Sequence, residues 1–347
     1  MTGKIRWGVI GSGGIAKRRT IPEGIVPAPN AELTAVFDTN AEANAEVASE
    51  FGAKAVRSLE ELLDSEVDAV YVASPVNKHY DHVMACAGAG KHVFCEKPLG
   101  MSPAEAEVMI AACEKQNVQL GAALMMRFLA QHQEARRLID EGKLGKPVYG
   151  RAQLSCWFPP MEGAWRQDPE LGGGGSLIDL GGHCIDLLEM FFGPVVKVAC
   201  FINNTVHSYA SEDSAATLLQ FENGAMGTVD TFFCIPDASS KNVLELYGSQ
   251  GSIHATGTIG QGEAGEMTAY LEEGAGEYDA QQARAGGEGL KIAPEPVNMY
   301  RAEVESFSQA LLDGKPAPVG PDVGLRSQKV LTACYDSAAS GKAVTLT

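Results

Sequence analysis

Short apolar runs alternate with helical segments over the first 120 residues, and this alternation restricts the fold more than any other feature. Strands are predicted at Lys4–Ile10, Glu32–Phe37 and Asp68–Ala73, each followed by a segment with helical spacing. The expected helices are one that begins over Ile15–Thr20, then Asn40–Phe51, His79–Gly88 and Ser102–Gln116. Two further strands are expected at Lys91–Cys95 and Gln119–Ala123. Repeated strand–helix units predict an α/β domain built on a doubly wound parallel sheet.

The pattern changes after about residue 145, where strands dominate and glycine-containing turns separate them. The expected strands are Val148–Ser155, Val196–Thr205, Ala215–Phe221, Ala225–Phe233, Val243–Tyr247 and Ser252–Ala255. We expect a large, open, mainly antiparallel sheet. Residues 257–296 are interpreted as a mobile loop with one strand, Met267–Glu272, and two helices, Met299–Leu312 and Leu325–Ala339, end the chain.

A chain of 347 residues is long for a single hydrophobic core, so we expect two domains. The change of pattern places the first domain at residues 1–123 and an α+β domain at residues 124–347. The two closing helices can pack back on the first domain.

Charge and composition exclude several classes of partner. The net charge of −17 disfavours nucleic acid and anionic membrane surfaces, which attract basic faces. The longest apolar runs fall short of the roughly 18–20 residues that span a bilayer, and the N-terminus lacks a signal-peptide core. The eight cysteines are scattered, which indicates reduced thiols. We therefore expect a cytoplasmic protein.

A glycine-rich turn follows the first predicted strand. It reads Gly11-Ser12-Gly13-Gly14-Ile15-Ala16. Between a strand and a helix, this pattern is the dinucleotide-binding fingerprint, because its glycines let backbone approach a pyrophosphate at the helix N-terminus. A structural turn is the alternative. Asp38, at the end of the second strand, is placed to accept the ribose hydroxyls.

The same carboxylate predicts which dinucleotide is bound. Asp38 would repel a 2′-phosphate, and no arginine follows it, so NAD is favoured over NADP. Lys17, Arg18 and Arg19 could tolerate extra phosphate charge, or simply form a solvated helix face.

Two further segments carry residue types suited to proton transfer. Glu96-Lys97-Pro98 directly follows a strand, and ligands in open parallel sheets lie at the carboxyl ends of strands. Asp179 and His183 fall four residues apart in a helix predicted at Leu177–Phe191, which places them on one face. Gly181 and Gly182 within that helix indicate close approach of a ligand or of another backbone. A buried Asp–His pair with helix-packing glycines is the alternative interpretation.

Several motifs together resemble one enzyme family. They are the glycine fingerprint, Ser74-Pro75-x-Asn77-x-His79, Gly90-Lys91-His92-Val93-x-Cys95-Glu96-Lys97-Pro98 and Asp179-x-Gly181-x-His183. From about residue 4 to the C-terminus the chain is similar to the glucose–fructose oxidoreductase, inositol dehydrogenase and rhizopine-catabolism family (Gfo/Idh/MocA). The resemblance implies a Rossmann domain, an open α/β sheet domain that forms a homodimer or homotetramer through its sheet face, and a nicotinamide cofactor.

The resemblance also implies roles for individual residues. His183 would be the base for the reacting hydroxyl, the Lys97 ammonium would stabilise the developing alkoxide, and Asp179 would orient a hydroxyl or the imidazole. Residues that would line the cofactor are Ser74, Pro75, Asn77, His79 and Glu96. Residues that would contact cofactor or substrate are Arg127, Trp157, Trp165 and Arg166. The aromatic residues Trp157, Phe158 and Trp165 could stack on a sugar ring or belong to the core.

These roles predict an oxidoreductase that transfers hydride between a nicotinamide cofactor and a hydroxyl or keto carbon of a sugar, sugar derivative or inositol. Redox-neutral glycoside cleavage or epimerisation with retained NAD is the enzymatic alternative, and a non-catalytic NAD sensor is another class. His79-x-x-His82 has a spacing seen in metal sites, but no third ligand lies nearby in the sequence, so we predict no metal.

Overall fold

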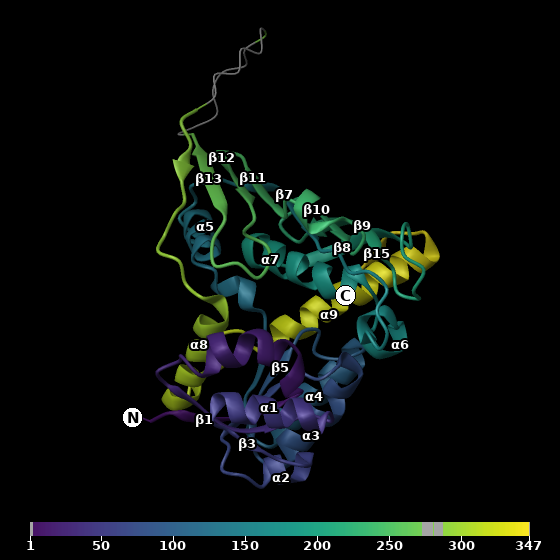
Figure 1. The fold of residues 1–347 in the computed structure, drawn as a ribbon. Helices are drawn as coiled ribbons and strands as arrows, with labels where there is room; N and C mark the ends of the chain where they lie inside the picture. The colour runs from purple at the N-terminus through teal and green to yellow at the C-terminus, as the bar shows by residue number, and fades with distance from the viewer. Residues whose placement is uncertain (1–2, 273–279, 281–286, 347) are drawn as a thin grey trace. The chain divides into compact units, whose positions relative to one another are not determined.

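The computed structural model describes residues 3–272, 280 and 287–346, and it divides into two compact units (Figure 1). The first unit comprises Met1–Phe128, Gly163–Gly174 and Asn298–Thr332. The second comprises Leu129–Glu162, Gly175–Val297 and Ala333–Thr347. The boundary near the C-terminus falls inside one helix, α9 (Pro321–Ser340).

The first unit is built on a six-stranded sheet with the order β3-β2-β1-β4-β5-β6. The strands are β1 (Ile5–Ile10), β2 (Ala31–Phe37), β3 (Lys54–Ala55), β4 (Ala69–Val72), β5 (His92–Glu96) and β6 (Leu120–Ala123). Every neighbouring pair is parallel, which confirms the predicted doubly wound sheet. The short edge strand β3 was not predicted, because two exposed residues carry no periodicity.

Helices join these strands and cover the sheet. They are η1 (Ser12–Ile25), α1 (Ala41–Phe51), α2 (Leu59–Leu63), η2 (Val76–Lys78), α3 (His79–Gly88), α4 (Pro103–Lys115), η3 (Met125–Phe128), η4 (Trp165–Gln167), α6 (Pro169–Gly172) and α8 (Met299–Asp313). Ser102 caps α4, with its hydroxyl accepting from Glu105 N at 3.2 Å. The helix predicted to begin over Ile15–Thr20 is η1, which extends to Ile25. In η1, wide π-type turns continue through Pro22, because a proline is tolerated where the i→i−4 ladder is already interrupted.

An aromatic cluster fixes α8 to this sheet. The rings of Phe94 and Phe307 stack with centroids 4.9 Å apart, and Trp7 packs against both. Trp7 Nε1 also donates to Ser308 Oγ at 3.1 Å. Gly121 makes room for the cluster, because a Cβ there would lie 2.6 Å from the Phe307 ring. The helix after residue 298 thus completes the core of the first unit.

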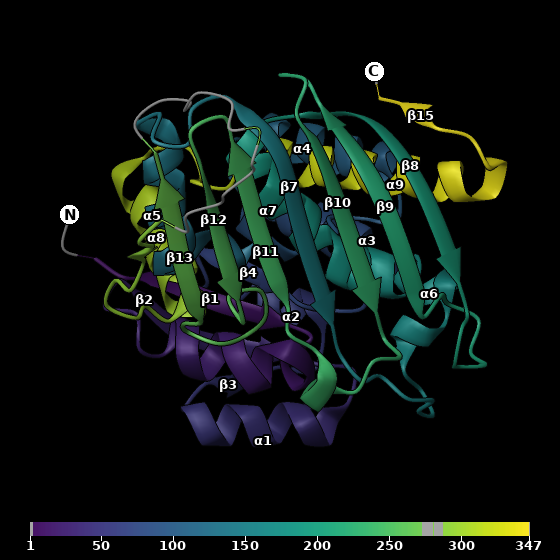
Figure 2. The same ribbon diagram turned by 90° about the horizontal axis from the view of Figure 1, so that it is seen from above.

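The second unit contains a nine-stranded sheet with the order β14-β13-β12-β11-β7-β10-β9-β8-β15, seen face-on in Figure 2. The strands are β7 (Pro147–Ser155), β8 (Val195–Asn203), β9 (Ser214–Phe221), β10 (Met226–Phe232), β11 (Val243–Gly248), β12 (Gly251–Thr256), β13 (Glu266–Leu271), β14 (Leu290–Lys291) and β15 (Val344–Thr345). All pairs are antiparallel except β7 with β10, so the predicted mainly antiparallel sheet is confirmed. The strand predicted at Met267–Glu272 is β13, and residues 273–279 and 281–286 of the predicted loop lie outside the described residues.

One face of this sheet is covered by helices α5 (Ala130–Asp140) and α7 (Gly182–Phe192). Every residue of α7 is buried, and Gly150 of β7 admits the helix, since a Cβ there would lie 2.7 Å from the Phe192 ring. Strands such as β9 alternate buried and exposed residues, as a sheet with one open face must. Among the described residues, no helix has the length and apolar character needed to cross a membrane.

Candidate active site

The glycine turn after β1 packs against the turn that follows β4. Gly11 has a φ of +79°, and a Cβ there would lie 2.7 Å from Ala73 C and from Ser74 N. Its own N–H donates to Phe37 O at 2.9 Å. Only glycine combines this left-handed conformation with such a close backbone approach.

The space in front of the turn is open. A Cβ at Gly14 would meet no atom within 4 Å, and Gly14 lies in the first turn of η1, which begins at Ser12. An open approach to glycine backbone at a helix N-terminus fits the pyrophosphate of a dinucleotide.

Asp38 holds the turn in place from the end of β2. Its Oδ2 accepts from Gly13 N and its Oδ1 accepts from Asn40 N, both at 2.9 Å. A carboxylate has about four acceptor positions, so two remain for ribose hydroxyls. The neighbouring cations form ion pairs within the protein, Lys17 with Glu46 at 2.7 Å and Arg19 with Glu23 at 2.5 Å.

His79 ties together the turns that follow β4 and β5. Its ring is 1% exposed, with Nδ1 2.9 Å from Pro98 O and Nε2 2.9 Å from Ser74 O. Burial lowers the pKa of His79 to about 4, so the ring is neutral at neutral pH and donates to one of these carbonyls. Both nitrogens therefore face protein atoms. Ser74 Oγ in turn lies 2.9 Å from Nδ1 of His82.

Neither histidine of the His79-x-x-His82 pair belongs to a metal-binding cluster in the described part of the chain. No group of three His, Cys, Asp or Glu side chains there is arranged to hold a metal ion. The hydrogen bonds of both rings instead serve the backbone and side chain around Ser74.

Glu96 ends β5 and accepts hydrogen bonds at both carboxylate oxygens. Tyr71 OH donates to Oε1 at 2.5 Å, and Lys97 N donates to Oε2 at 3.2 Å. Thr20 Oγ1 donates to Tyr71 OH at 2.9 Å, which extends the chain of hydrogen bonds into η1. Burial raises the pKa of Glu96 despite these donors. The Lys97–Pro98 peptide is cis, and the Lys97 side chain is partly exposed.

Glu303 is a buried acid that the sequence analysis missed. It lies on α8 and is 1% exposed, and its Oε2 has no hydrogen-bond partner among the described residues. Burial, and then the charge of Glu96, raise the pKa of Glu303 well above its ordinary value, so we describe it as a neutral acid. Its spacing from Met299 and Phe307 places it on the apolar face of the helix, which is the sequence signal for this burial.

The remaining predicted residues of the first unit lie on short helical turns. Arg166 follows Trp165 on η4 with its guanidinium 4.2 Å from the centre of the Trp165 ring. Its charge also lowers the pKa of Glu96, though less than the nearer groups do. Pro75 and Asn77 belong to the turn η2 after β4, and Arg127 lies on η3 after β6, partly exposed.

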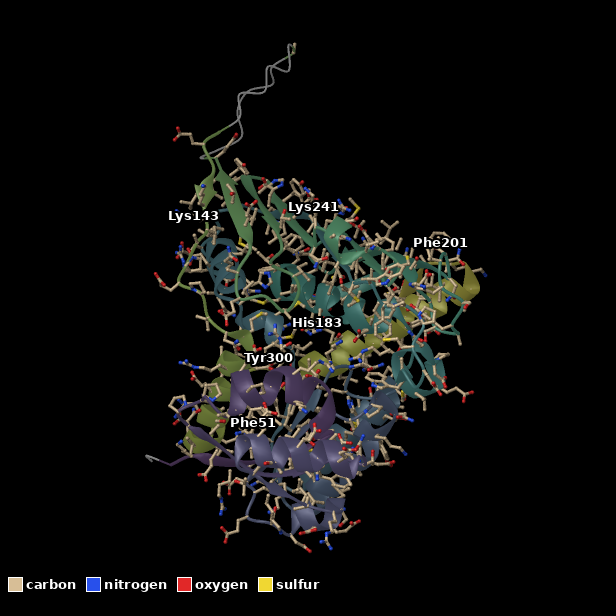
Figure 3. All side chains as sticks on the ribbon, viewed as in Figure 1. Phe51, Lys143, His183, Phe201, Lys241 and Tyr300 are labelled. Carbon is tan, nitrogen blue, oxygen red and sulfur yellow. The ribbon has the colours of Figure 1, made fainter. Side chains whose placement is uncertain are left out.

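In the second unit, Asp179 and His183 lie on consecutive helical segments. The helix predicted over Leu177–Phe191 is present in two consecutive parts, because η5 (Leu177–Gly181) is a wide π-type turn and α7 begins at Gly182. Asp179 is partly exposed, whereas His183 is 8% exposed (Figure 3). A Cβ at Gly181 would lie 3.0 Å from the Leu177 side chain, so this glycine serves packing.

Trp157 and Phe158 follow β7 and have different surroundings. Trp157 is 42% exposed, with its ring centroid 5.0 Å from that of His207. Phe158 packs on buried Phe233 at a centroid distance of 4.9 Å. Trp157 is therefore exposed, whereas Phe158 is only partly exposed.

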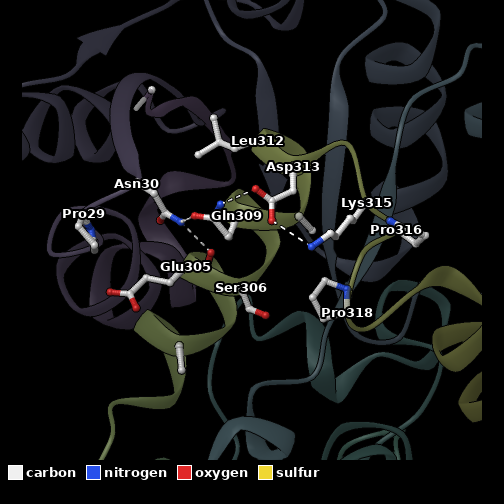
Figure 4. Close-up of a pocket in the computed structure, with 13 residues that line it drawn as sticks. Pro29, Asn30, Glu305, Ser306, Gln309, Leu312, Asp313, Lys315, Pro316 and Pro318 are labelled. Carbon is white, nitrogen blue, oxygen red and sulfur yellow. Dashed lines mark hydrogen bonds and ion pairs between the residues drawn. The ribbon is translucent and has the colours of Figure 1, made fainter. Parts of the chain in front are cut away.

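A cavity of about 810 Å³ elsewhere on the first unit contains none of the predicted site residues (Figure 4). Its polar groups bond to one another. Asn30 Nδ2 donates to Glu305 O at 2.9 Å, Gln309 Nε2 donates to Asp313 Oδ1 at 2.8 Å, and Lys315 pairs with Asp313 at 3.4 Å. These side chains are engaged with one another, so we assign no catalytic role to this cavity.

Comparison with known proteins agrees with these features. A model of the oxidoreductase family with an NAD-binding Rossmann fold (GFO/IDH/MocA) matches residues 5–124, and a model of the GFO/IDH/MocA C-terminal domain matches residues 132–254. The chain is 31% identical to the 1,5-anhydro-D-fructose reductase of Ensifer adhaerens, with 97% of each chain covered. It is 30% identical to the D-xylose 1-dehydrogenase (NADP(+)) 2 of Haloferax volcanii, with 98% of this chain and 99% of that one covered.

Among solved structures, that of the aldose-aldose oxidoreductase from Caulobacter crescentus complexed with glycerol has a TM-score of 0.87 at 26% identity. The match covers 99% of this chain and 100% of that one. The protein therefore belongs to the GFO/IDH/MocA family of oxidoreductases, and the family resemblance of its motifs is confirmed. Its first domain is an NAD(P)-binding Rossmann fold.

We expect Gly11→Ala to disrupt the cofactor site, because the new methyl group would force the turns after β1 and β4 apart. Unfolding in denaturant should show a loss of about 2–4 kcal/mol, and NADH affinity, followed by fluorescence, should fall at least about tenfold. Gly52→Ala is the matched control, since Gly52 has a φ of +71° but no atom within 4 Å of its Cβ position. Equal losses in the two variants would contradict the close-approach argument.

We expect Glu303→Gln to change the pH dependence of stability. The folded-state pKa of Glu303 lies above its ordinary value of 4.5, so the unfolded chain releases this proton first. The wild type should therefore lose about 1.4 kcal/mol per pH unit from this group as pH rises between the two pKa values. Melting temperatures at pH 5, 6 and 7 should favour the variant increasingly, whereas exposed Glu114→Gln should show no such trend. If the melting temperatures of wild type and Glu303→Gln changed with pH in parallel, the description of Glu303 as a neutral acid in the folded protein would be refuted.

Proposed function

We propose that this oxidoreductase transfers hydride between NAD and a hydroxyl or keto carbon of a sugar, sugar derivative or inositol. The observation that carries the proposal is the joint presence of an open glycine turn, Lys97 directly after β5, and Asp179 and His183 at the start of a buried helix. The relatives named above include a reductase of an anhydrosugar and a dehydrogenase of a sugar, which supports this substrate class.

Three side chains carry the proposed chemistry. A bound nicotinamide supplies the hydride acceptor or donor. His183 takes the proton of the substrate hydroxyl, because an imidazole titrates near neutrality. The Lys97 ammonium donates a hydrogen bond to the oxygen that gains negative charge, and Asp179 orients a substrate hydroxyl or the imidazole. Ser74, Pro75, Asn77 and Glu96 serve the nicotinamide ribose, and His79 holds their turns in place.

The remaining predicted residues bind the two ligands. Trp165 and Arg166 contact cofactor or substrate, and Arg127 and Trp157 contact the substrate. Two observations support these contacts. All four side chains are at least partly exposed, and the charge of Arg166 acts on the pKa of Glu96.

We favour NAD over NADP. This preference is supported by the Asp38 carboxylate beside the glycine turn, which would repel a 2′-phosphate bound there, and by the ion pairs that engage Lys17 and Arg19. The relative that uses NADP(+) shows that this preference needs a direct measurement. Titration of the wild type with NADH and with NADPH should give tighter binding of NADH, and tighter binding of NADPH would overturn the assignment.

A substrate screen separates the dehydrogenase from redox-neutral cleavage or epimerisation. The purified protein is incubated with aldoses, anhydrosugars, inositols and aryl glycosides, together with NAD or NADP. The dehydrogenase predicts that NADH accumulates in step with the oxidised product. Release of the aglycone or a changed sugar configuration without net NADH would favour the retained-cofactor scheme instead.

The open sheet face and the eight cysteines supply two further parts of the proposal. We expect a homodimer or homotetramer that forms through the outer face of the nine-stranded sheet, where Phe201, Leu218 and Met226 are 78%, 60% and 58% exposed (Figure 3). None of the eight cysteines, all of which the structure describes, forms a disulfide, which is consistent with the cytoplasm as the working compartment.

Lys97→Ala should lower turnover by about 10²- to 10⁴-fold, because the variant loses the hydrogen-bond donor to the alkoxide. His183→Ala should lose chemistry to a similar extent and keep its affinity for NADH. Steady-state rates and NADH titrations measure both effects. Lys115→Ala, an exposed lysine in the last turn of α4, is the control. A near-normal rate for Lys97→Ala would remove this residue from the mechanism.

Leu218→Glu should dissociate the oligomer, because it places a charge in the apolar sheet face. Light scattering coupled to size-exclusion chromatography gives the mass of wild type and variant. Val206→Glu adds the same charge at an equally exposed position outside the sheet strands, 60% in both cases, and should leave the mass unchanged. A wild-type monomer would reject the proposed assembly.

A further inference from the structure

Two adjacent acidic residues, Glu212 and Asp213, lie buried just before β9. Glu212 is 5% exposed and Asp213 is 0% exposed. The proposed chemistry uses neither residue, and buried carboxylates are costly unless their oxygens are bonded. Their partners come from two different segments of the second unit.

Glu212 binds the backbone at the start of the segment that carries Asp179. Its Oε2 accepts from Gly175 N at 2.8 Å and its Oε1 accepts from Leu177 N at 2.9 Å. Tyr335 OH donates to the same Oε1 at 3.0 Å. These contacts satisfy N–H groups that a helix start leaves without intrahelical partners.

The backbone of Glu212 reinforces this attachment. Ser176 N donates to Glu212 O at 3.0 Å, and a Cβ at Gly175 would lie 2.0 Å from the same oxygen. The backbones of Gly175 and Glu212 are therefore in contact, and only a residue without a Cβ fits at position 175. Residues 175–177 cannot shift without breaking the contacts of Glu212, and Asp179 follows two residues later.

Asp213 binds a second segment, the loop that follows β8. Its Oδ2 accepts from Val206 N at 2.7 Å and from His207 N at 2.8 Å, while its Oδ1 accepts from Thr205 N at 2.8 Å. Ser214 Oγ donates to Oδ1 at 2.7 Å. Burial tends to raise the pKa of Asp213, but these hydrogen bonds outweigh it and hold the pKa below its ordinary value.

The loop that Asp213 holds carries part of an aromatic wall, which we define as Trp157, His207 and Tyr209. The His207 ring lies between the other two, with centroids 5.0 Å from Trp157 and 5.2 Å from Tyr209. Tyr209 OH donates to Phe158 O at 3.0 Å, which fixes the wall to the segment after β7. Trp157 leaves 42% of its surface exposed.

We propose that Glu212 and Asp213 are positioning residues of the substrate site. Glu212 fixes the segment that carries Asp179 and His183, and Asp213 fixes the aromatic wall, on which the apolar C–H face of a sugar ring packs. One peptide bond joins the two acids, so the reacting groups and the wall are held by a common rigid support. This inference rests on the proposed function, and it adds the residues that position the substrate.

The proposal predicts different kinetic defects for the two acids. Glu212→Gln replaces one acceptor oxygen by an amide nitrogen, so kcat should fall about 10- to 100-fold while KM and NADH affinity change less than about threefold. Asp213→Asn loosens the wall, so KM for the sugar should rise about tenfold with a smaller change in kcat. Tyr335→Phe removes a single contact of Glu212 and should give an intermediate kcat. Glu222→Gln, an exposed glutamate of the same unit, should behave as wild type.

Hydrogen exchange read by mass spectrometry tests the same proposal without turnover. Glu212→Gln should speed exchange in residues 175–183, and Asp213→Asn should speed exchange in residues 205–207, each by at least about tenfold. Proportional losses of kcat, KM and cofactor affinity in both variants would show general damage and overturn the proposal. So would unchanged exchange in both variants.

The two proposals can fail separately. If the wild type oxidises none of the sugars and reduces none of the keto sugars, the proposed function falls and the substrate role of the two acids falls with it. If the wild type turns over a sugar but the variants keep its kinetic constants and exchange rates, only the positioning role is rejected.

Discussion

The cofactor-binding unit depends on the close contact between the turn after β1 and the turn after β4. At Gly11 the backbone comes so near Ala73 and Ser74 that a side chain would not fit. This contact is possible because β1 and β4 are adjacent parallel strands, so their carboxyl ends lie at the same edge of the sheet. His79 then joins the β4 turn to Pro98 after β5. Three turns thereby form a continuous backbone surface at the edge where open parallel sheets bind ligands.

Sequence periodicity predicted both sheets because their patterns are local. The strand–helix alternation predicted the parallel sheet, and the glycine fingerprint predicted the turn at Gly11. The parallel pairing of β7 with β10 was not predicted, since strand direction depends on partners far apart in the chain. The wide turns of η1 and η5 also escaped prediction. A search for a 3.6-residue period assumes regular α-helices and overlooks π-type turns.

The candidate site was predicted only where motifs place residues directly after strands or on one helix. Lys97 and Glu96 were found in this way, and so were Asp179 and His183. The supporting acids were not, because their partners are remote in sequence. Glu212 bonds to Gly175, 37 residues earlier, and Glu303 interacts electrostatically with Glu96 on another element. An acidic residue on the apolar face of a helix, as at Glu303, is the one local sequence signal of such a buried acid.

Three glutamates, Glu96, Glu212 and Glu303, show how surroundings shift the pKa of a carboxyl group. Glu96 accepts from Tyr71 and from a backbone N–H, Glu212 accepts from three donors, and burial raises the pKa of both. In Glu303 one carboxyl oxygen has no hydrogen-bond partner among the described residues, and the pKa is raised well above its ordinary value. Glu303 is therefore the one best described as a neutral acid. A carboxyl group that accepts several hydrogen bonds can hold backbone segments rigidly, because the segments cannot shift without breaking those bonds. In the proposal above, Glu212 supplies this support for Asp179 and His183, because it accepts from Gly175 N and Leu177 N just before a helix whose residues are all buried.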